Sequence, residues 1–166
     1  MKQQIIVSGT GGQGVLFLTR VLAQAGLDMG LEVLTSETHG MAMRGGTVIS
    51  HVKVGPFRSP LVMRGCADTG LILHRGNLEF HGDFIRQDGF CIVNADRPGS
   101  YLQVDAMAQA REIGSLVVAN LVLLGFAVKK GALFCDVSVM DRVIREVSQP
   151  RNLEMNLRGF ERGLQS

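Results

Sequence analysis

The feature that most constrains the fold is a glycine-rich turn between an apolar run and an amphipathic segment near the N-terminus. Residues 4–8 read as a buried strand, and Gly9-Thr10-Gly11-Gly12-Gln13-Gly14 follows at once. From Val15 to Met29, apolar residues recur every three or four positions, which indicates a helix. A strand, a Gly-x-Gly-x-x-Gly turn and a helix in this order are typical of a phosphate-binding turn in a Rossmann-like fold.

The physical chemistry of such a turn favours an anion. Glycine lets a ligand approach the main chain closely, and the first amides of a helix lack partners and carry about half a positive charge. We therefore predict cofactor contacts by Gly9, Thr10, Gly11, Gly12, Gln13 and Gly14. A side chain at Gly11 or Gly14 should then obstruct the phosphate. The alternative is a tight structural turn that binds nothing.

Composition and charge exclude several classes of protein. The net charge is +2 and the basic residues form no long run, so neither nucleic acid nor an anionic membrane is indicated as a partner. The longest apolar stretch, residues 116–128, is shorter than the roughly 20 residues that a membrane span needs. The chain enters a strand at once, without a signal-peptide pattern, so we expect a cytoplasmic protein.

The sequence contains no motif for a metal centre or a catalytic nucleophile. Cys66, Cys91 and Cys135 lie far apart, and no Cys-x-x-Cys pair is present. The four histidines show no ligand spacing with them. We therefore predict no metal ligand, no iron–sulfur ligand and no catalytic residue on this chain.

Strands and helices alternate along the chain, without internal repeats. The expected strands are residues 4–8, 31–36, 47–54, 69–73 and 90–93, and the expected helices are residues 15–29, 77–85, 106–113, 116–130, 138–149 and 153–164. This order predicts an α/β fold: one domain over residues 1–166, a three-layer α/β/α sandwich with a mostly parallel sheet. Residues 47–54 follow no evident helix and are a candidate antiparallel strand.

A second group of candidate site residues follows the second strand. Glu37 lies 37 − 14 = 23 residues after Gly14, near the spacing of the acidic residue that binds ribose in dinucleotide folds, although a surface glutamate is an equal alternative. His39, Arg44, Gly45 and Gly46 share the next loop. Arg44 could bind a phosphate or carboxylate through two donors. The alternative is a glycine hairpin in which Arg44 forms a salt bridge.

Asn120 is the single polar residue in the middle of the apolar helix expected at residues 116–130. Buried amides need hydrogen-bond partners. Asn120 therefore either bonds the backbone inside the fold or faces a ligand or a subunit. We retain it as a candidate cofactor contact.

Taken together, these motifs resemble the gamma subunit, or gamma domain, of 2-oxoacid:ferredoxin oxidoreductases. The resemblance covers nearly the whole chain and rests on the order of several short elements. They are Gly9-Thr10-Gly11-Gly12-Gln13-Gly14-Val15, Arg44-Gly45-Gly46, Ser59-Pro60, Ala67-Asp68, Asn94, Ala119-Asn120 with Leu124-Gly125, and Asn156 with Gly163. The loop at residues 36–46 looks most like that of the small subunit of indolepyruvate:ferredoxin oxidoreductase.

The resemblance implies a division of labour between chains. Such enzymes decarboxylate a 2-oxoacid on thiamine diphosphate, pass electrons through iron–sulfur clusters to ferredoxin, and transfer the acyl group to coenzyme A. The thiamine diphosphate and the clusters would lie on a larger partner subunit, whereas this chain would hold coenzyme A and be inactive alone. Glu37, His39 and Arg44 would then face the partner or the ligand. Without its partner, the chain would expose apolar surface and could form a homodimer.

Two other functions remain open from the residues alone. One is a free-standing NAD- or FAD-dependent dehydrogenase module, for which 166 residues leave little room for a substrate domain. The other is a structural or assembly module whose glycine turn binds nothing.

Overall fold

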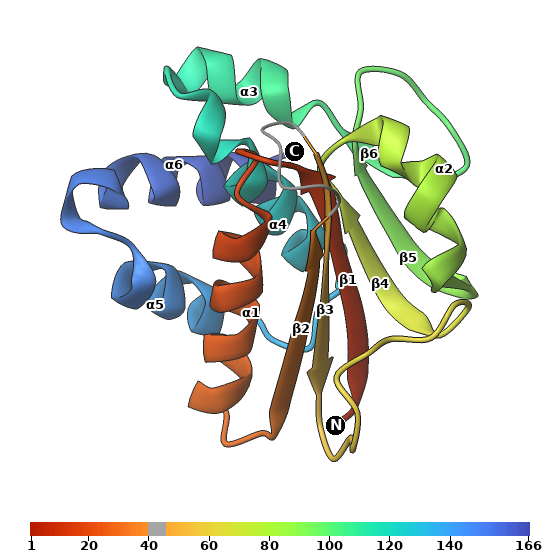
Figure 1. Ribbon diagram of the computed structural model, residues 1–166. Helices are drawn as coiled ribbons and strands as arrows, with labels where there is room; N and C mark the ends of the chain where they lie inside the picture. The colour runs from red at the N-terminus through yellow and green to blue at the C-terminus, as the bar shows by residue number, and fades with distance from the viewer. Residues whose placement is uncertain (40–45) are drawn as a thin grey trace.

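A six-stranded mixed sheet forms the centre of the computed structural model, which describes residues 1–39 and 46–166 (Figure 1). The strand order is β2-β3-β1-β4-β5-β6. The strands are β1 (Gln3–Thr10), β2 (Val33–His39), β3 (Thr47–Val54), β4 (Ala67–Ile72), β5 (Ile85–Asn94) and β6 (Leu102–Val104). The predicted α/β class is confirmed.

One strand runs against the others. β1, β4, β5 and β6 pair in parallel, whereas β3 is antiparallel to both β1 and β2. The candidate antiparallel strand at residues 47–54 is therefore confirmed. The physical reason is the short connection from β2, which leaves no space for the crossover helix that a parallel pair requires. As a result, β3 separates β2 from β1.

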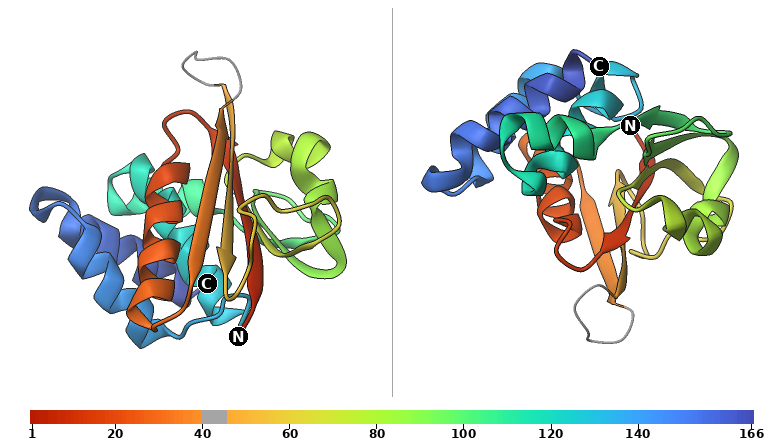
Figure 2. Two further views of the ribbon diagram at one scale, coloured as in Figure 1. Left: turned by 60° about the horizontal axis from the view of Figure 1, so that its bottom comes forward. Right: turned by 90° about the horizontal axis from the view of Figure 1, so that it is seen from above.

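The helices cover the two faces of the sheet unequally (Figure 2). They are α1 (Val15–Asp28), α2 (Leu78–His81), α3 (Ala106–Ile113), α4 (Ala119–Lys129), α5 (Val137–Val147) and α6 (Leu153–Leu164). One face is covered by α1 and α4, with α5 and α6 packed outside them. The other face is covered by the short α2 and the irregular segment at residues 55–66. No helix in the described residues is long and apolar enough to cross a membrane.

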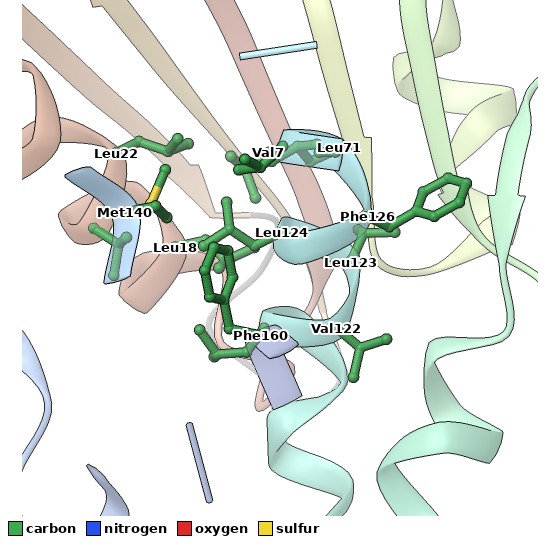
Figure 3. Packing of buried hydrophobic residues seen from close by; sticks show 14 of the residues in the cluster. Val7, Leu18, Leu22, Leu71, Val122, Leu123, Leu124, Phe126, Met140 and Phe160 are labelled. Atoms are coloured by element: carbon green, nitrogen blue, oxygen red, sulfur yellow. The ribbon is translucent and has the colours of Figure 1, made fainter. Parts of the chain in front are cut away.

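The main core lies where α4 packs between the sheet and α6. All residues of α4 from Ala119 to Val128 are buried, as expected for a helix that is apolar nearly all round. Phe160 of α6 packs among its leucines (Figure 3). The two helices cross closely because Gly125 and Gly163 each lie against the other helix's backbone. The predicted amphipathic C-terminal helix thus covers α4.

Three local predictions were wrong in detail. The strand predicted at residues 90–93 begins earlier, because Ile85 already pairs with Ala67 of β4 and the register then shifts so that Phe90 pairs with Thr69. The helix predicted from Ser138 begins at Val137, capped by the Asp136 side chain, which accepts a hydrogen bond from Val139 N at 3.0 Å. The helix predicted at residues 77–85 is only one α-helical turn, α2, between two 3₁₀ turns.

Candidate functional site

The glycine turn joins the end of β1 to the start of α1 and is braced by Gln13. The Gln13 side chain accepts a hydrogen bond from Thr10 N at 2.8 Å and donates one to Leu73 O at 3.2 Å. The Gln13 backbone N–H donates to Thr10 O at 3.1 Å. Gln13 was predicted as a cofactor contact, but its amide is engaged in holding the turn against the end of β4.

The glycines of the turn have different surroundings. A Cβ at Gly9 would lie 2.9 Å from both Gln13 Oε1 and Val15 Cγ2, and a Cβ at Gly14 would overlap the Asn120 side-chain amide. Gly12, in contrast, has φ +92°, and a Cβ added there would have no described atom within 4 Å. The expected consequence of a side chain at Gly14 is therefore revised: it would strike α4 rather than a phosphate.

The N-terminus of α1 is open to a ligand. Gly14, its N-cap residue, has φ 81°, and within the described residues the helix has neither a side-chain cap nor an acidic residue in its first turn. A pocket of about 350 Å³ adjoins this helix end. The described residues that line it are those of the glycine turn together with Val15, Leu16 and Val48, and none of them is charged. Leu16 is 44% exposed. Uncapped amides at a helix N-terminus are donors that suit a phosphate.

Asn120 connects α4 to the turn. It is 1% exposed, and its Nδ2 donates to Gly14 O at 3.3 Å while its Oδ1 accepts from Leu121 N at 2.8 Å. Of the two roles left open by the sequence, the hydrogen bond to the backbone is present. Asn120 fixes the position of the turn relative to the start of α4.

The second group of predicted site residues lies at the same end of the sheet but is only partly described. Glu37 is exposed on β2, opposite Ser50 of β3, and His39 is the last residue of β2. Gly46 O accepts a hydrogen bond from Gly11 N at 3.0 Å, which ties this loop to the glycine turn. Arg44 and Gly45 lie outside the described residues.

The position of Glu37 argues against a ribose contact. In a dinucleotide-binding fold the strand that carries this acidic residue is adjacent to the first strand. Here β3 intervenes, so Glu37 lies on a strand about 10 Å from β1, twice the spacing of neighbouring strands. The position of Glu37 therefore does not support a contact with the ribose of NAD.

Two residues that the sequence analysis missed lie beside the turn. Arg20 of α1 and Arg151, in the turn before α6, line a second cleft that also includes Gly14. Arg20 follows Gly14 on the helix that the turn begins, but a spacing of six residues does not return to the same helix face, so the sequence alone does not point to it. No sequence signal connects Arg151 with the turn, because only the packing of α6 brings it there.

Two of the three cysteines are kept in the thiol form at neutral pH by their surroundings. Burial raises the pKa of the Cys91 thiol, and burial, followed by the nearby Asp136 carboxylate, raises the pKa of Cys135 to about 12. Within residues 1–39 and 46–166, no group of three or more His, Cys, Asp or Glu side chains could hold a metal ion.

Comparison with known proteins decides the family. The model of the family described as pyruvate ferredoxin/flavodoxin oxidoreductase matches residues 4–166. The chain belongs to this family. The resemblance read from the glycine turn and the later motifs is therefore confirmed.

Relatives of this oxidoreductase family extend over almost the whole chain. Indolepyruvate oxidoreductase subunit IorB of Archaeoglobus fulgidus is 29% identical over 98% of this chain and 94% of its own length. The crystal structure of pyruvate oxidoreductase subunit PORC of Thermotoga maritima has a TM-score of 0.81 at 21% identity, covering 99% of this chain and 96% of that one. The latter likeness supports the fold alone.

A third similar structure is 2-oxoglutarate:ferredoxin oxidoreductase from Magnetococcus marinus, with 2-oxoglutarate, coenzyme A and succinyl-CoA bound. Its TM-score is 0.79 at 20% identity. The match covers 99% of this chain but only 30% of that one. In that protein, the same fold is one part of a longer polypeptide.

Proposed function

We propose that this chain is the coenzyme A-holding small subunit of an indolepyruvate-type 2-oxoacid:ferredoxin oxidoreductase. Membership of the family makes it a subunit of an oxidoreductase that acts on 2-oxoacids and reduces ferredoxin. The similarity to an indolepyruvate oxidoreductase subunit over nearly the full length supports the substrate class. Its location in the cytoplasm stays a prediction.

The observation that carries the coenzyme A assignment is the uncapped N-terminus of α1 beside an uncharged pocket. The amides of Val15, Leu16 and Phe17 begin the helix, and the first turn contains no carboxylate that would repel a diphosphate. Gly12 leaves the approach to the main chain open. The amides of this turn would hold the diphosphate of coenzyme A, whose thiol receives the acyl group when it is bound.

The remaining chemistry belongs to a partner. The larger subunit would carry the thiamine diphosphate and the iron–sulfur clusters and pass electrons to ferredoxin. The Magnetococcus marinus protein supports this proposal, because there the matching fold is part of a longer chain, of which it covers 30%. The end of β2 with Glu37 and His39, together with Arg44, Gly45 and Gly46, would face that partner or the ligand. Self-association of the isolated chain remains a prediction.

A substitution at Leu16 tests the assignment with little risk to the fold. Leu16→Glu adds a carboxylate to the first turn of α1, where it should stabilise the helix by about 0.5 kcal/mol. The same carboxylate should weaken coenzyme A binding about tenfold or more by repelling the diphosphate. Leu16→Gln, of the same shape without the charge, is the matched control. Calorimetric titration of the full chain, alone and with its partner subunit, measures both affinities.

The two variants separate an electrostatic effect from a steric one. The proposal requires Leu16→Gln to bind coenzyme A much more tightly than Leu16→Glu. Equal affinities in the two variants, or binding of NADH in preference to coenzyme A, would refute it.

A further inference from the structure

A second cleft, of about 510 Å³, lies on the helix-rich side of the glycine turn. It is enclosed by the start of α1, the start of α4 and the connection from α5 to α6, and it shares Gly14 with the smaller uncharged pocket. A ligand that passes the N-terminus of α1 would therefore reach both spaces. Nothing in the assignment made so far uses this cleft.

Three helix N-termini converge on the cleft. Gly14 is the N-cap residue of α1, Val118 that of α4 and Asn152 that of α6, and all three line the space. None of the three helices has a side-chain cap in the described structure. Each helix contributes a partial positive charge at this end, which Glu154 in the first turn of α6 offsets for that helix, so the contribution that favours an anion comes mainly from α1 and α4.

The charged side chains of the cleft have the same sign. Arg20 and Arg151 are its only charged lining residues, and neither forms an ion pair within the described part of the chain. Arg151 Nε instead donates to Gln149 Oε1 at 3.1 Å. A second groove, which Gln13 also lines, differs in its charge. Its lining contains Arg75 and Arg111 but also two carboxylates, those of Asp96 and Asp105.

A buried amide in the cleft also lacks a partner on one side. Asn156 is 7% exposed, and its Nδ2 donates to Ser148 Oγ at 2.9 Å. The other end of this amide has no hydrogen bond to any described residue. Since an amide can turn to present either its oxygen or its NH₂ group, Asn156 can serve a ligand as an acceptor or a donor. Phe17 and Met155 add apolar wall beside it.

We propose that this cleft binds the phosphorylated adenosine end of coenzyme A, with Arg20 and Arg151 holding the 3′-phosphate. This inference rests on the proposed function. Two arginines without a competing carboxylate in the described lining suit a phosphate monoester, and the apolar wall suits an adenine ring. The diphosphate lies at Gly14, where the two spaces meet, and the uncharged pantetheine arm lies in the pocket beside Leu16 and Val48.

The test compares coenzyme A with dephospho-coenzyme A, which lacks only the 3′-phosphate. The wild-type full chain, with its partner subunit where the complex is needed, should bind coenzyme A at least about tenfold more tightly than dephospho-coenzyme A. In the double variant Arg20→Gln/Arg151→Gln, this ratio should fall to about one or two. The matched control Arg75→Gln/Arg111→Gln, in the charge-balanced groove, should retain the wild-type ratio.

The outcomes distinguish this inference from the proposed function. If Leu16→Glu weakens coenzyme A binding but the Arg20/Arg151 variant keeps the wild-type ratio, the adenosine assignment is wrong and the diphosphate site stands. A ratio lost in the Arg75/Arg111 variant would overturn it by locating the 3′-phosphate in the other groove. If wild type binds neither compound, both proposals fail.

Discussion

The face of the sheet beneath α1 and α4 carries the main apolar core, whereas the face beneath α2 combines a smaller apolar cluster with a group of hydrogen-bonded polar side chains. On the α2 face, Asn77 Nδ2 donates to Ser8 Oγ at 2.9 Å, and Ser8 Oγ lies 2.6 Å from His81 Nδ1. Val62 N donates to His51 Nδ1 at 3.1 Å. The first face therefore depends mainly on close packing, whereas the second also depends on hydrogen bonds that involve two histidines.

This difference locates the candidate site. The three helix N-termini and the two arginines that line the larger cleft belong to the apolar face, where long helices end together at the glycine turn. Among the described residues, the α2 face has no comparable helix, because α2 is a single turn. Packing of long helices on the first face thus forms the candidate site beside the glycine turn, whereas the elements on the second face only cover the sheet.

The largest effect is expected from a methyl group placed between α4 and α6. In Gly125→Ala the new Cβ would overlap Phe160 O and lie 3.0 Å from Leu164 N, so the helices must separate. Because backbone cannot yield as a side chain does, the free energy of unfolding should fall by about 3 kcal/mol. Urea denaturation measures this change.

The matched change on the other face is Gly82→Ala. There, a Cβ would meet only Leu78 among the described residues, at 3.8 Å or more, and the backbone is already helical. We expect stability unchanged or raised by less than about 1 kcal/mol. Equal losses in both variants would remove the contrast between the two faces.

A smaller, pH-dependent effect is expected on the α2 face. Burial, then His81 and Lys53, hold the pKa of His51 below its ordinary value of 6.5. Burial and Arg64 also lower the pKa of His81, against an opposing contribution from Asp83. As pH falls through and below 6.5, the unfolded chain therefore binds protons that the folded chain does not yet bind. Stability should be fully present above that pH and decrease below it.

Urea midpoints at pH 7.5 and pH 5.5 measure this dependence. Wild type should lose more stability over this interval than the double variant His51→Gln/His81→Gln, which cannot gain these two protons. An identical change in wild type and variant would mean that these histidines do not control the acid response of this face.

Much of the fold could be predicted because its signals are local. Asp105 caps α3 by accepting a hydrogen bond from Ala108 N at 2.9 Å, and Gly114 ends that helix with φ 100°. The apolar spacing of residues 153–164 likewise gave α6. The strand at residues 85–94 was only partly predicted, because its start is set by the pairing of Ile85 with Ala67 of β4 and by a register shift before Phe90, which local composition does not encode.

The candidate site, like the fold, could be predicted only where its signals are local in the sequence. The glycine turn could be read from consecutive residues, but the role of each glycine could not, because Gly14 is constrained by Asn120, 106 positions away. Arg151 was missed for the same reason, since it reaches the cleft only through the packing of α6.

Amide hydrogen–deuterium exchange of the full chain with and without coenzyme A, in the presence of its partner where needed, compares the two faces most directly. We predict slower exchange on binding for residues 12–18 and 118–121, at the starts of α1 and α4, and no change for residues 78–84 around α2. Unchanged exchange at residues 12–18, or protection confined to residues 78–84, would contradict the assignment of coenzyme A to the glycine turn.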